Sequence, residues 1–200
     1  MPTGVALRDP REQLFAAAER VLLREGASGL TSRAVTDEAG VSKGVMHRHF
    51  PDFDAFLTEL VLDHASQLET QTTALRESVG TGTVVDNLAA VLVSLFSPVT
   101  VAIIPLITFH DQLRSRLRRA APGGGIAILA QATAAISDYL ARERDLGRIA
   151  ADTDIDSLSL SLVGGGHLLS AENASRSLPD AATLSLVTAV LANSAGQRPS

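Results

Sequence analysis

The sequence contains 200 residues, 46% of them hydrophobic, which is enough for one large domain or two small ones with a buried core. Cysteine is absent, which excludes disulfides and cysteine-based zinc sites and fits a reducing compartment. The formal net charge of −5 argues mildly against a nucleic-acid partner. The N-terminus lacks the apolar stretch of a secretory signal, so we expect a cytoplasmic protein.

The charges are unevenly distributed over the first sixty residues. This part of the chain holds seven Lys/Arg and nine Asp/Glu, so its net charge of −2 does not by itself favour DNA. Between Glu38 and Asp52, however, there is no acidic residue. The same stretch contains four basic or ionisable side chains, those of Lys43, His47, Arg48 and His49. This small positive patch is what a DNA-reading helix needs.

One uncharged segment is long enough to cross a bilayer. Residues 88–109 carry no charge over 22 positions. Two prolines, Pro98 and Pro105, interrupt the segment, and no cluster of Lys/Arg flanks it to set an orientation. We therefore predict two buried helices, separated at Pro98, and no membrane partner.

Three short helices are predicted before residue 50. In the first, apolar residues recur at helical spacing from residue 14 to residue 22, and it ends near Gly26 or Gly29. The second begins at Thr31 and ends before Gly40. Ser42 then opens a third helix, which ends near residue 49 or 50.

The rest of the chain is also predicted to be helical. Pro51 and Asp52 interrupt the chain and start a long fourth helix, because proline does not readily continue a helix and aspartate is a good N-cap. Its apolar residues, from Phe53 to Leu68, form one stripe. The spacing and the breaks predict six further helices: Thr83–Phe96, Pro98–Thr108, Asp111–Ala120, Ile126–Leu146, Ile155–Asn173 and Pro179–Asn193.

Residues 157–162 alternate Ser and Leu, a period that by itself suggests a strand. No other segment offers this strand a partner, and a lone strand is not stable, so we predict a helix. Three successive glycines, Gly164–Gly166, follow at a cost of about 1 kcal/mol each in helix propensity. Either they allow close approach of another helix, or the helix breaks there.

The segment Gly29–Phe50 carries the functional pattern. Two short helices are separated by Gly40-Val41-Ser42, a turn with a flexible glycine and a serine cap. On the third helix, Met46 and Phe50 lie four residues apart and share the inner face. The outward residues are then Lys43, Gly44, His47 and Arg48. A major groove accepts an exposed, acid-free helix of this kind on a compact three-helix unit.

These residues resemble the signature of the TetR family of bacterial repressors. The resemblance covers about Arg11 to Leu60, under a third of the chain, and its turn, caps and spacing agree. It implies an all-α protein, with an N-terminal three-helix bundle that contains a helix-turn-helix, followed by a larger helical ligand-binding and dimerisation domain. The matching pattern is Thr31-x-Arg33…Ala39-Gly40-Val41-Ser42-Lys43-Gly44…His49-Phe50, preceded by Ala16-Ala17-Ala18…Leu22…Glu25-Gly26.

The resemblance also implies roles for single residues. Thr31 would cap the second helix and bind phosphate, and Ser42 would cap the third. Lys43 would read bases, while His47 and His49 would meet the DNA backbone. The full set implied to contact DNA is Thr31, Ser32, Arg33, Ser42, Lys43, Gly44, Val45, His47, Arg48 and His49.

Two positions depart from the family pattern. His47 stands where the family usually has Tyr; it can still donate to phosphate, more strongly if protonated. Phe53 stands where Lys is frequent, so one common phosphate anchor is missing. The alternative for His47 and His49 is that both are ordinary solvated residues.

We predict a DNA-binding domain over residues 1–53 and a ligand-binding and dimerisation domain over residues 54–200. The resemblance implies a homodimer that binds a near-palindromic double-stranded operator and leaves it when a small-molecule effector binds. No metal or other cofactor is expected. Six residues are candidates for lining the effector pocket, with plain core as the alternative: His64, Phe96, Phe109, His110, Gln112 and Tyr139.

The last two predicted helices are almost free of charged residues. A solvent-facing helix would normally carry charges on one side, so this composition predicts burial on all sides. We predict that the two helices pack against their symmetry mates as a four-helix bundle; burial within one monomer is the alternative. The predicted dimer residues are Leu158, Leu162, Gly165, Leu169, Val187, Val190 and Leu191.

The alternatives to a DNA-binding regulator are an enzyme and a helical interaction module. The nearest approaches to a catalytic pair, His110-Asp111 and His167 among serines, lie in no nucleophile elbow, phosphate loop or metal motif, so we do not expect an enzyme. A helical interaction module without DNA binding is the other class. Four arginines within residues 114–119 predict a solvated face, with a second DNA-contact patch as the alternative.

Overall fold

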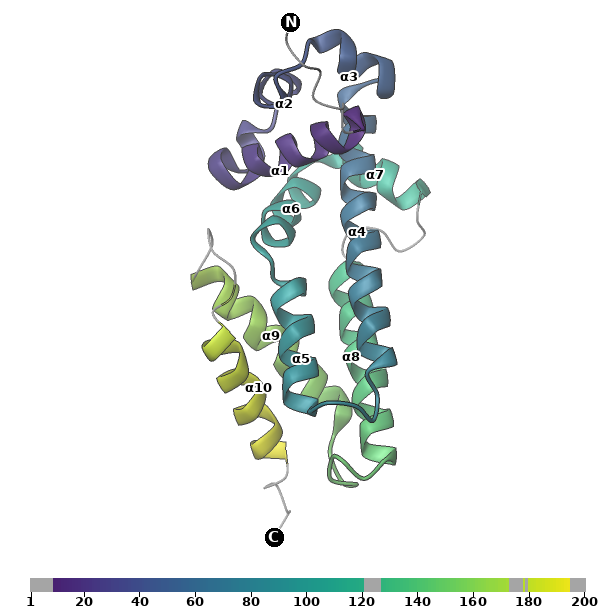
Figure 1. Ribbon diagram of the computed structural model, residues 1–200, viewed down its shortest axis with the longest axis vertical. Coiled ribbons are helices and arrows are strands. Elements are labelled where there is room, and N and C mark those ends of the chain that lie inside the picture. The colour runs from purple at the N-terminus through teal and green to yellow at the C-terminus, as the bar shows by residue number, and fades with distance from the viewer. Residues whose placement is uncertain (1–8, 121–126, 173–177, 179, 195–200) are drawn as a thin grey trace, which may run out of the picture. The chain divides into compact units, whose positions relative to one another are not determined.

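The computed structural model describes residues 9–120, 127–172, 178 and 180–194. Over these residues it contains ten helices and no strand, which confirms the predicted all-α fold (Figure 1). The helices are α1 (Pro10–Gly29), α2 (Ser32–Ala39), α3 (Lys43–His49), α4 (Phe53–Glu77), α5 (Val84–Leu95), α6 (Pro98–Phe109), α7 (Asp111–Ala120), α8 (Ala127–Asp145), α9 (Ile155–Glu172) and α10 (Asp180–Ser194).

The chain forms two compact units that do not follow chain order. The first unit comprises residues 1–63 and 102–125, and the second comprises residues 64–101 and 126–200. The first unit therefore contains α1 to α3, the start of α4, most of α6 and all of α7. The predicted domain boundary at residue 53 coincides with the start of α4, a helix that runs on into the second unit.

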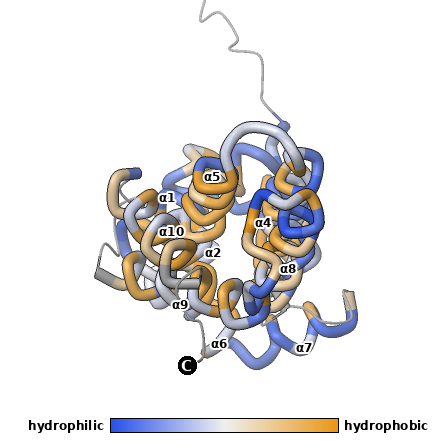
Figure 2. Tube along the Cα trace, turned by 90° about the horizontal axis from the view of Figure 1, so that it is seen from below, coloured by the Kyte–Doolittle hydropathy of each residue, from blue (hydrophilic) through white to orange (hydrophobic). Residues whose placement is uncertain are grey.

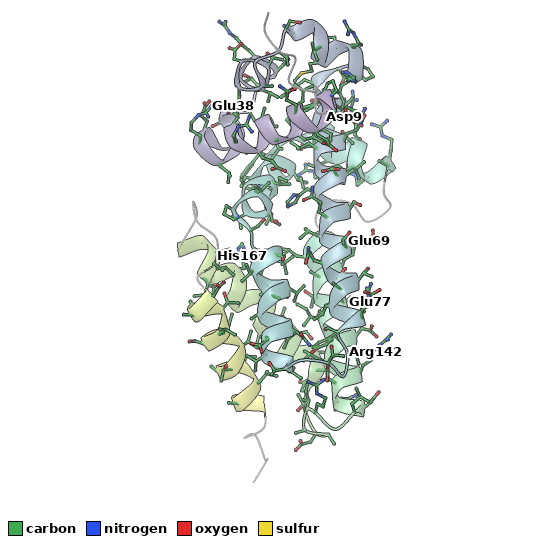
Figure 3. The ribbon with its side chains drawn as sticks, viewed as in Figure 1. Asp9, Glu38, Glu69, Glu77, Arg142 and His167 are labelled. Carbon is green, nitrogen blue, oxygen red and sulfur yellow. The ribbon has the colours of Figure 1, made fainter. Side chains whose placement is uncertain are left out.

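Polar side chains and glycines define the ends of the first helices. Asp9, labelled in Figure 3, accepts a hydrogen bond from the Arg11 N–H at 2.9 Å and so caps α1. α1 has a non-helical residue at Gly26, with φ 71°, and ends at Gly29, so both glycines interrupt it as predicted. Gly40 ends α2 with φ 67°, a left-handed conformation that favours glycine.

Aromatic rings form part of the core of the first unit. The rings of Phe50 and Phe56 meet edge to face with centroids 5.0 Å apart, and Phe15 lies 5.6 Å from Phe56. The guanidinium of Arg11 lies 4.7 Å from the centroid of the Phe50 ring. Because Phe50 directly follows α3, this cluster fixes the end of that helix against α1 and α4.

The core of the second unit is built mainly from α5, α8, α9 and α10. Figure 2 shows hydrophobic stretches along α5 and α8, whereas α7 is largely hydrophilic. The most deeply buried core residues include Leu88, Leu92, Phe96, Ile136, Tyr139, Leu140, Leu162 and Val187.

The uncharged segment 88–109 forms two helices, as predicted, with the break at residues 96–97. Each helix buries apolar residues, among them Leu92 in α5 and Ile103 in α6. In the described part of the chain, no single helix is long and apolar enough to cross a membrane. α5 and α6 reach that length and composition only when they are taken together as a bent pair.

α9 continues without a break through Gly164–Gly166, so the alternating Ser and Leu residues are helical, as predicted. A Cβ atom at Gly165 would lie 2.6 Å from Cδ1 of Leu186 in α10. A Cβ atom at Gly166 would lie 2.5 Å from Cε2 of Phe96, the residue after α5. The glycines therefore allow α10 and α5 to approach α9 closely within one chain.

A buried carboxylate joins two turns of the second unit. Glu143 is fully buried; its Oε1 accepts a hydrogen bond from the Gly80 N–H at 3.0 Å, and its Oε2 lies 3.0 Å from Nη1 of Arg148. Nη2 of Arg148 donates to the carbonyl of Gly82 at 2.5 Å. Burial, together with Glu143 beside it, raises the pKa of Tyr139 to about 12. The turn after α4 and the turn after α8 are thereby held together.

Candidate nucleic-acid interface

The faces of α3 are those that the sequence predicts. Met46 and the following Phe50 are each 1% exposed and lie on the inner side. The exposed residues of the helix are Lys43, Gly44, His47 and Arg48. No carboxylate lies between Glu38 and Asp52, so the outer face of α3 carries positive charge only. This geometry suits a helix that enters the major groove.

Two predicted contact residues lie at the margin of this face. Val45 and His49 are half-buried. The His49 ring lies 6.5 Å from the Phe50 ring, between centroids. Both side chains are therefore less accessible than those of Lys43, His47 and Arg48.

Ser42 occupies the N-cap position of α3, but its side chain makes no capping hydrogen bond, so the implied cap by its hydroxyl is wrong. Its carbonyl accepts the Val45 N–H at 2.9 Å, and its side chain is exposed. With the backbone carbonyl closing the first turn, the hydroxyl is available to an external acceptor such as a phosphate.

The predicted residues around the start of α2 have different surroundings. Thr31 is exposed and caps α2, because its Oγ1 accepts the Ala34 N–H at 3.1 Å. The Ser32 hydroxyl donates to the Met46 sulfur at 3.2 Å and so faces α3. The side chain of Arg33 is 91% exposed, with its Nε 3.6 Å from Oδ2 of Asp37. Thr31 and Arg33 are therefore accessible to DNA, whereas Ser32 joins α2 to α3.

A polar frame that the sequence did not reveal holds α2 on α1. Glu38, labelled in Figure 3, accepts hydrogen bonds from Nε of Arg20 at 2.6 Å and Nη1 of Arg24 at 2.8 Å. These hydrogen bonds, Arg20 first, hold the pKa of Glu38 below its usual value. Gln13 donates to the carbonyl of Ala39 at 2.8 Å, directly before the turn. Residues distant in sequence thus position the turn between α2 and α3.

Phe53, which replaces a frequent lysine, has a structural role. Its ring is stacked on Phe56, with centroids 5.6 Å apart and an interplanar angle of 18°. It extends the aromatic cluster of the first unit, which a lysine side chain would not do.

Comparison with known proteins agrees with this geometry. Residues 14–60 match the sequence model of the bacterial regulatory proteins of the tetR family. This match confirms, over residues 14–60, the resemblance to the TetR family that the sequence predicts. It favours a DNA-binding transcriptional regulator over an enzyme. Among curated proteins, no sequence matches the chain.

Solved structures of bacterial transcriptional regulators share the fold over most of their length. A regulator from Mesorhizobium loti is 20% identical, with a TM-score of 0.59 over 92% of this chain and 96% of its own. A regulator from a Rhodococcus species is also 20% identical, with a TM-score of 0.61 over 91% and 98%. FadR from Bacillus subtilis, solved with stearoyl-CoA, is 17% identical, with a TM-score of 0.61 over 90% and 97%.

The six predicted effector-pocket residues are divided between the two units. In the second unit, Phe96 and Tyr139 are at most 1% exposed and belong to its core. His64 is buried, with its Nε2 2.8 Å from the Thr100 hydroxyl. In the first unit, Phe109 is 86% exposed, Gln112 is exposed and His110 is half-buried. The three residues of the first unit do not form an enclosed pocket wall.

A cavity of about 410 Å³ lies elsewhere in the second unit. It is bounded by residues 82–85 at the start of α5, by residues between Arg148 and Thr153, and by Leu191 of α10. None of the six predicted effector-pocket residues lines it. The predicted set therefore does not coincide with this cavity.

The predicted dimer residues face inward to a large extent. Leu158, Leu162 and Val187 are at most 4% exposed and lie in the core of one monomer. Gly165 is covered by Leu186 of the same chain. Leu169, Val190 and Leu191 are half-buried and pack against the same core. Most of the predicted dimer residues are therefore buried within one monomer, as the alternative prediction has it.

Sequence reasoning missed the apolar residues that face outward. Leu160 and Leu168 of α9 are 67% and 69% exposed, and Leu184 of α10 is 36% exposed. Leu160, the exposed Gly164 and Leu168 follow one another at intervals of four residues and so share one face of α9. That spacing of four was the signal in the sequence that could have identified this face.

Proposed function

We propose that this protein is a regulator of the TetR family, a cytoplasmic homodimeric repressor that leaves a near-palindromic operator when a small molecule binds residues 54–200. The observation that carries the proposal is the exposed, acid-free face of α3 on a compact three-helix unit. Lys43 begins that helix and is the first candidate for reading bases, while Arg33 and His49 flank it as backbone contacts.

A dimer is proposed through the outer faces of α9 and α10. Between Asp156 and Glu172, and between Asp180 and the end of α10, neither helix carries a charged residue. The exposed Leu160, Leu168 and Leu184 would be hidden when two copies pack as a four-helix bundle. These residues take the place of the inward-facing ones in the predicted interface.

A small-molecule effector is proposed on the general logic of such a dimer. A ligand that favours a dimer geometry in which the two α3 helices no longer match successive major grooves lowers operator affinity. The matching geometry separates half-sites by about 34–36 Å, one helical turn, or a multiple. The FadR structure with stearoyl-CoA is a case of a similar fold with a small-molecule ligand; the identity of the ligand does not carry over.

A mobility-shift titration with the DNA that flanks the protein's own gene tests the proposal. We expect a saturable complex that survives excess unrelated DNA, with two protomers per operator. A protein that binds no flanking DNA more tightly than unrelated DNA would be a helical interaction module, the alternative class. Complexes with one protomer per site would refute the dimer alone.

A further inference from the structure

Two side chains, those of His110 just before α7 and Arg116 within it, reach the junction between α3 and α4 inside the first unit. Nη2 of Arg116 lies 2.9 Å from Oδ2 of Asp52, and Nε2 of His110 lies 3.5 Å from Oδ1 of Asp54. α7 buries Leu113 and Leu117. These apolar residues anchor the helix, while Arg116 and the preceding His110 approach the start of α4.

Asp52 combines two roles at this junction. Its Oδ1 accepts the Ala55 N–H at 2.7 Å and caps α4, while its Oδ2 receives Arg116. The Ala55 N–H first, and Arg116 second, hold the pKa of Asp52 below its usual value. Asp52 comes three residues after the last residue of α3, so whatever fixes Asp52 also limits how α3 can turn relative to α4.

Asp52 is also the first carboxylate after the acid-free stretch. Its side chain is half exposed, at 49%, beside a surface that must approach phosphates. The contact between Arg116 and Asp52 therefore lies next to the surface proposed to face DNA.

The other arginines of α7 have different surroundings. Arg114 pairs with Asp111 and donates to the carbonyl of Thr108 at 2.8 Å. Nη2 of Arg119 donates to the Ser115 hydroxyl at 3.1 Å. Arg118 is exposed and forms no ion pair among the described residues. Arg118 is therefore a matched control for Arg116, because it has the same charge on the same helix without the anchor.

We propose that Arg116 is a positioning residue for DNA reading: by clamping Asp52 it fixes the orientation of α3. This inference rests on the proposed DNA-binding function. Of the four arginines within residues 114–119, Arg116 would then neither simply face solvent nor contact a phosphate directly.

Affinities of Arg116→Gln, Asp52→Asn and Arg118→Gln for operator and for unrelated DNA test the clamp. Asn is as good an N-cap as Asp, so Asp52→Asn removes the charge partner and keeps the cap of α4. We expect Arg116→Gln and Asp52→Asn each to weaken operator binding about two- to fivefold, as befits an exposed ion pair. The double variant should be no weaker than either single variant. Arg118→Gln and all affinities for unrelated DNA should stay unchanged.

A direct phosphate contact by Arg116 would give a different pattern. Arg116→Gln would then weaken binding to both DNAs and reduce the salt slope by about 0.9 per protomer, while Asp52→Asn would strengthen binding. Each of three results would overturn the clamp. The first is this direct-contact pattern, and the second is an unchanged operator affinity in Arg116→Gln. The third is a loss of operator affinity in Arg118→Gln equal to that in Arg116→Gln.

Amide hydrogen exchange gives a readout without DNA. We expect faster exchange in residues 45–50 of Arg116→Gln than in the parent or in Arg118→Gln, because α3 is held less firmly. Unchanged exchange there would also overturn the clamp. If the parent protein binds no operator, the proposed function fails while this measurement still decides whether Arg116 positions α3.

Discussion

Lys43 and His49 lie at opposite ends of α3 and differ in accessibility. Lys43 is exposed at the first position of the helix, where a long cation can enter the groove. His49 is half-buried at the last position, beside Phe50. Base contacts distinguish sequences and backbone contacts do not, so the two side chains should have separable effects.

We expect Lys43→Ala to weaken operator binding by about tenfold and to reduce the preference for operator over unrelated DNA. His49→Ala should weaken binding to both DNAs by a similar, smaller factor. Fluorescence anisotropy with both DNAs measures the two ratios. Parental affinity in both variants would contradict the assignment of the DNA-contacting residues.

Gly40 and Gly44 are a matched pair of positions for testing the turn between α2 and α3. A Cβ atom at Gly40 would meet nothing within 4 Å, but its φ of 67° is unfavourable for alanine. Gly44 lies within α3, where an added Cβ would be 3.7 Å from the Ser42 hydroxyl, an ordinary contact. In thermal unfolding, we expect Gly40→Ala to lower Tm by about 2–4 °C, from about 1 kcal/mol of strain, and Gly44→Ala to leave it equal or higher. Equal Tm values for the two variants would refute the role of Gly40.

The contact face of α3 could be predicted because a period of four residues, Met46 to Phe50, fixes both sides of a short helix. The Glu38 frame could not, since its partners Arg20 and Arg24 are 18 and 14 residues away. The wrong expectation for Ser42 has a similar cause. A serine before a helix occupies the N-cap position, but side-chain torsion decides whether its hydroxyl turns to the backbone.

At the level of the helices, composition predicted that α9 and α10 are buried, but not which side faces which partner. Two helices without charges give no polar side from which to orient them. The exposed Leu160 and Leu168 could be told from the buried Leu158 and Leu162 only when α5 and α8 were seen to cover the latter.

The dimer should depend on the outer face of α9. Leu168→Asp places a charge in the proposed interface without touching the monomer core, so we expect dissociation into monomers at micromolar concentration with little loss of Tm. Leu23→Asp, on a leucine of α1 that is 42% exposed, is the matched control and should stay dimeric. Sedimentation velocity distinguishes the species. A monomeric parent, or a dimeric Leu168→Asp, would exclude this interface.

In the whole molecule, the pairing of helices into two units lay beyond the sequence. α6 and α7 follow α5 in the chain yet group with the DNA-binding helices. Hydrophobic periodicity reveals that Leu113 and Leu117 face a core, but not which core. The tertiary grouping also explains why the predicted pocket residues fall into two sets.

The small number of exposed cations around the reading helix predicts a modest salt dependence of operator binding. Each protomer offers three exposed cations around the reading helix, Arg33, Lys43 and Arg48, so a dimer should neutralise about six phosphates. We expect a slope of log affinity against log salt of about −5. A titration of Kd between low and physiological salt measures it. A slope as steep as about −10 would indicate a further basic surface.

The three glycines of α9 should differ in how well they tolerate substitution. In a library that randomises each position, Gly164 should accept alanine or serine, because no atom lies within 4 Å of its added Cβ. Gly165 should be intermediate, because the end of the Leu186 side chain can rotate away. Gly166 should tolerate substitution least, since its added Cβ would lie 2.5 Å from the ring of the buried Phe96. Mutational tolerance should therefore fall from Gly164 to Gly166.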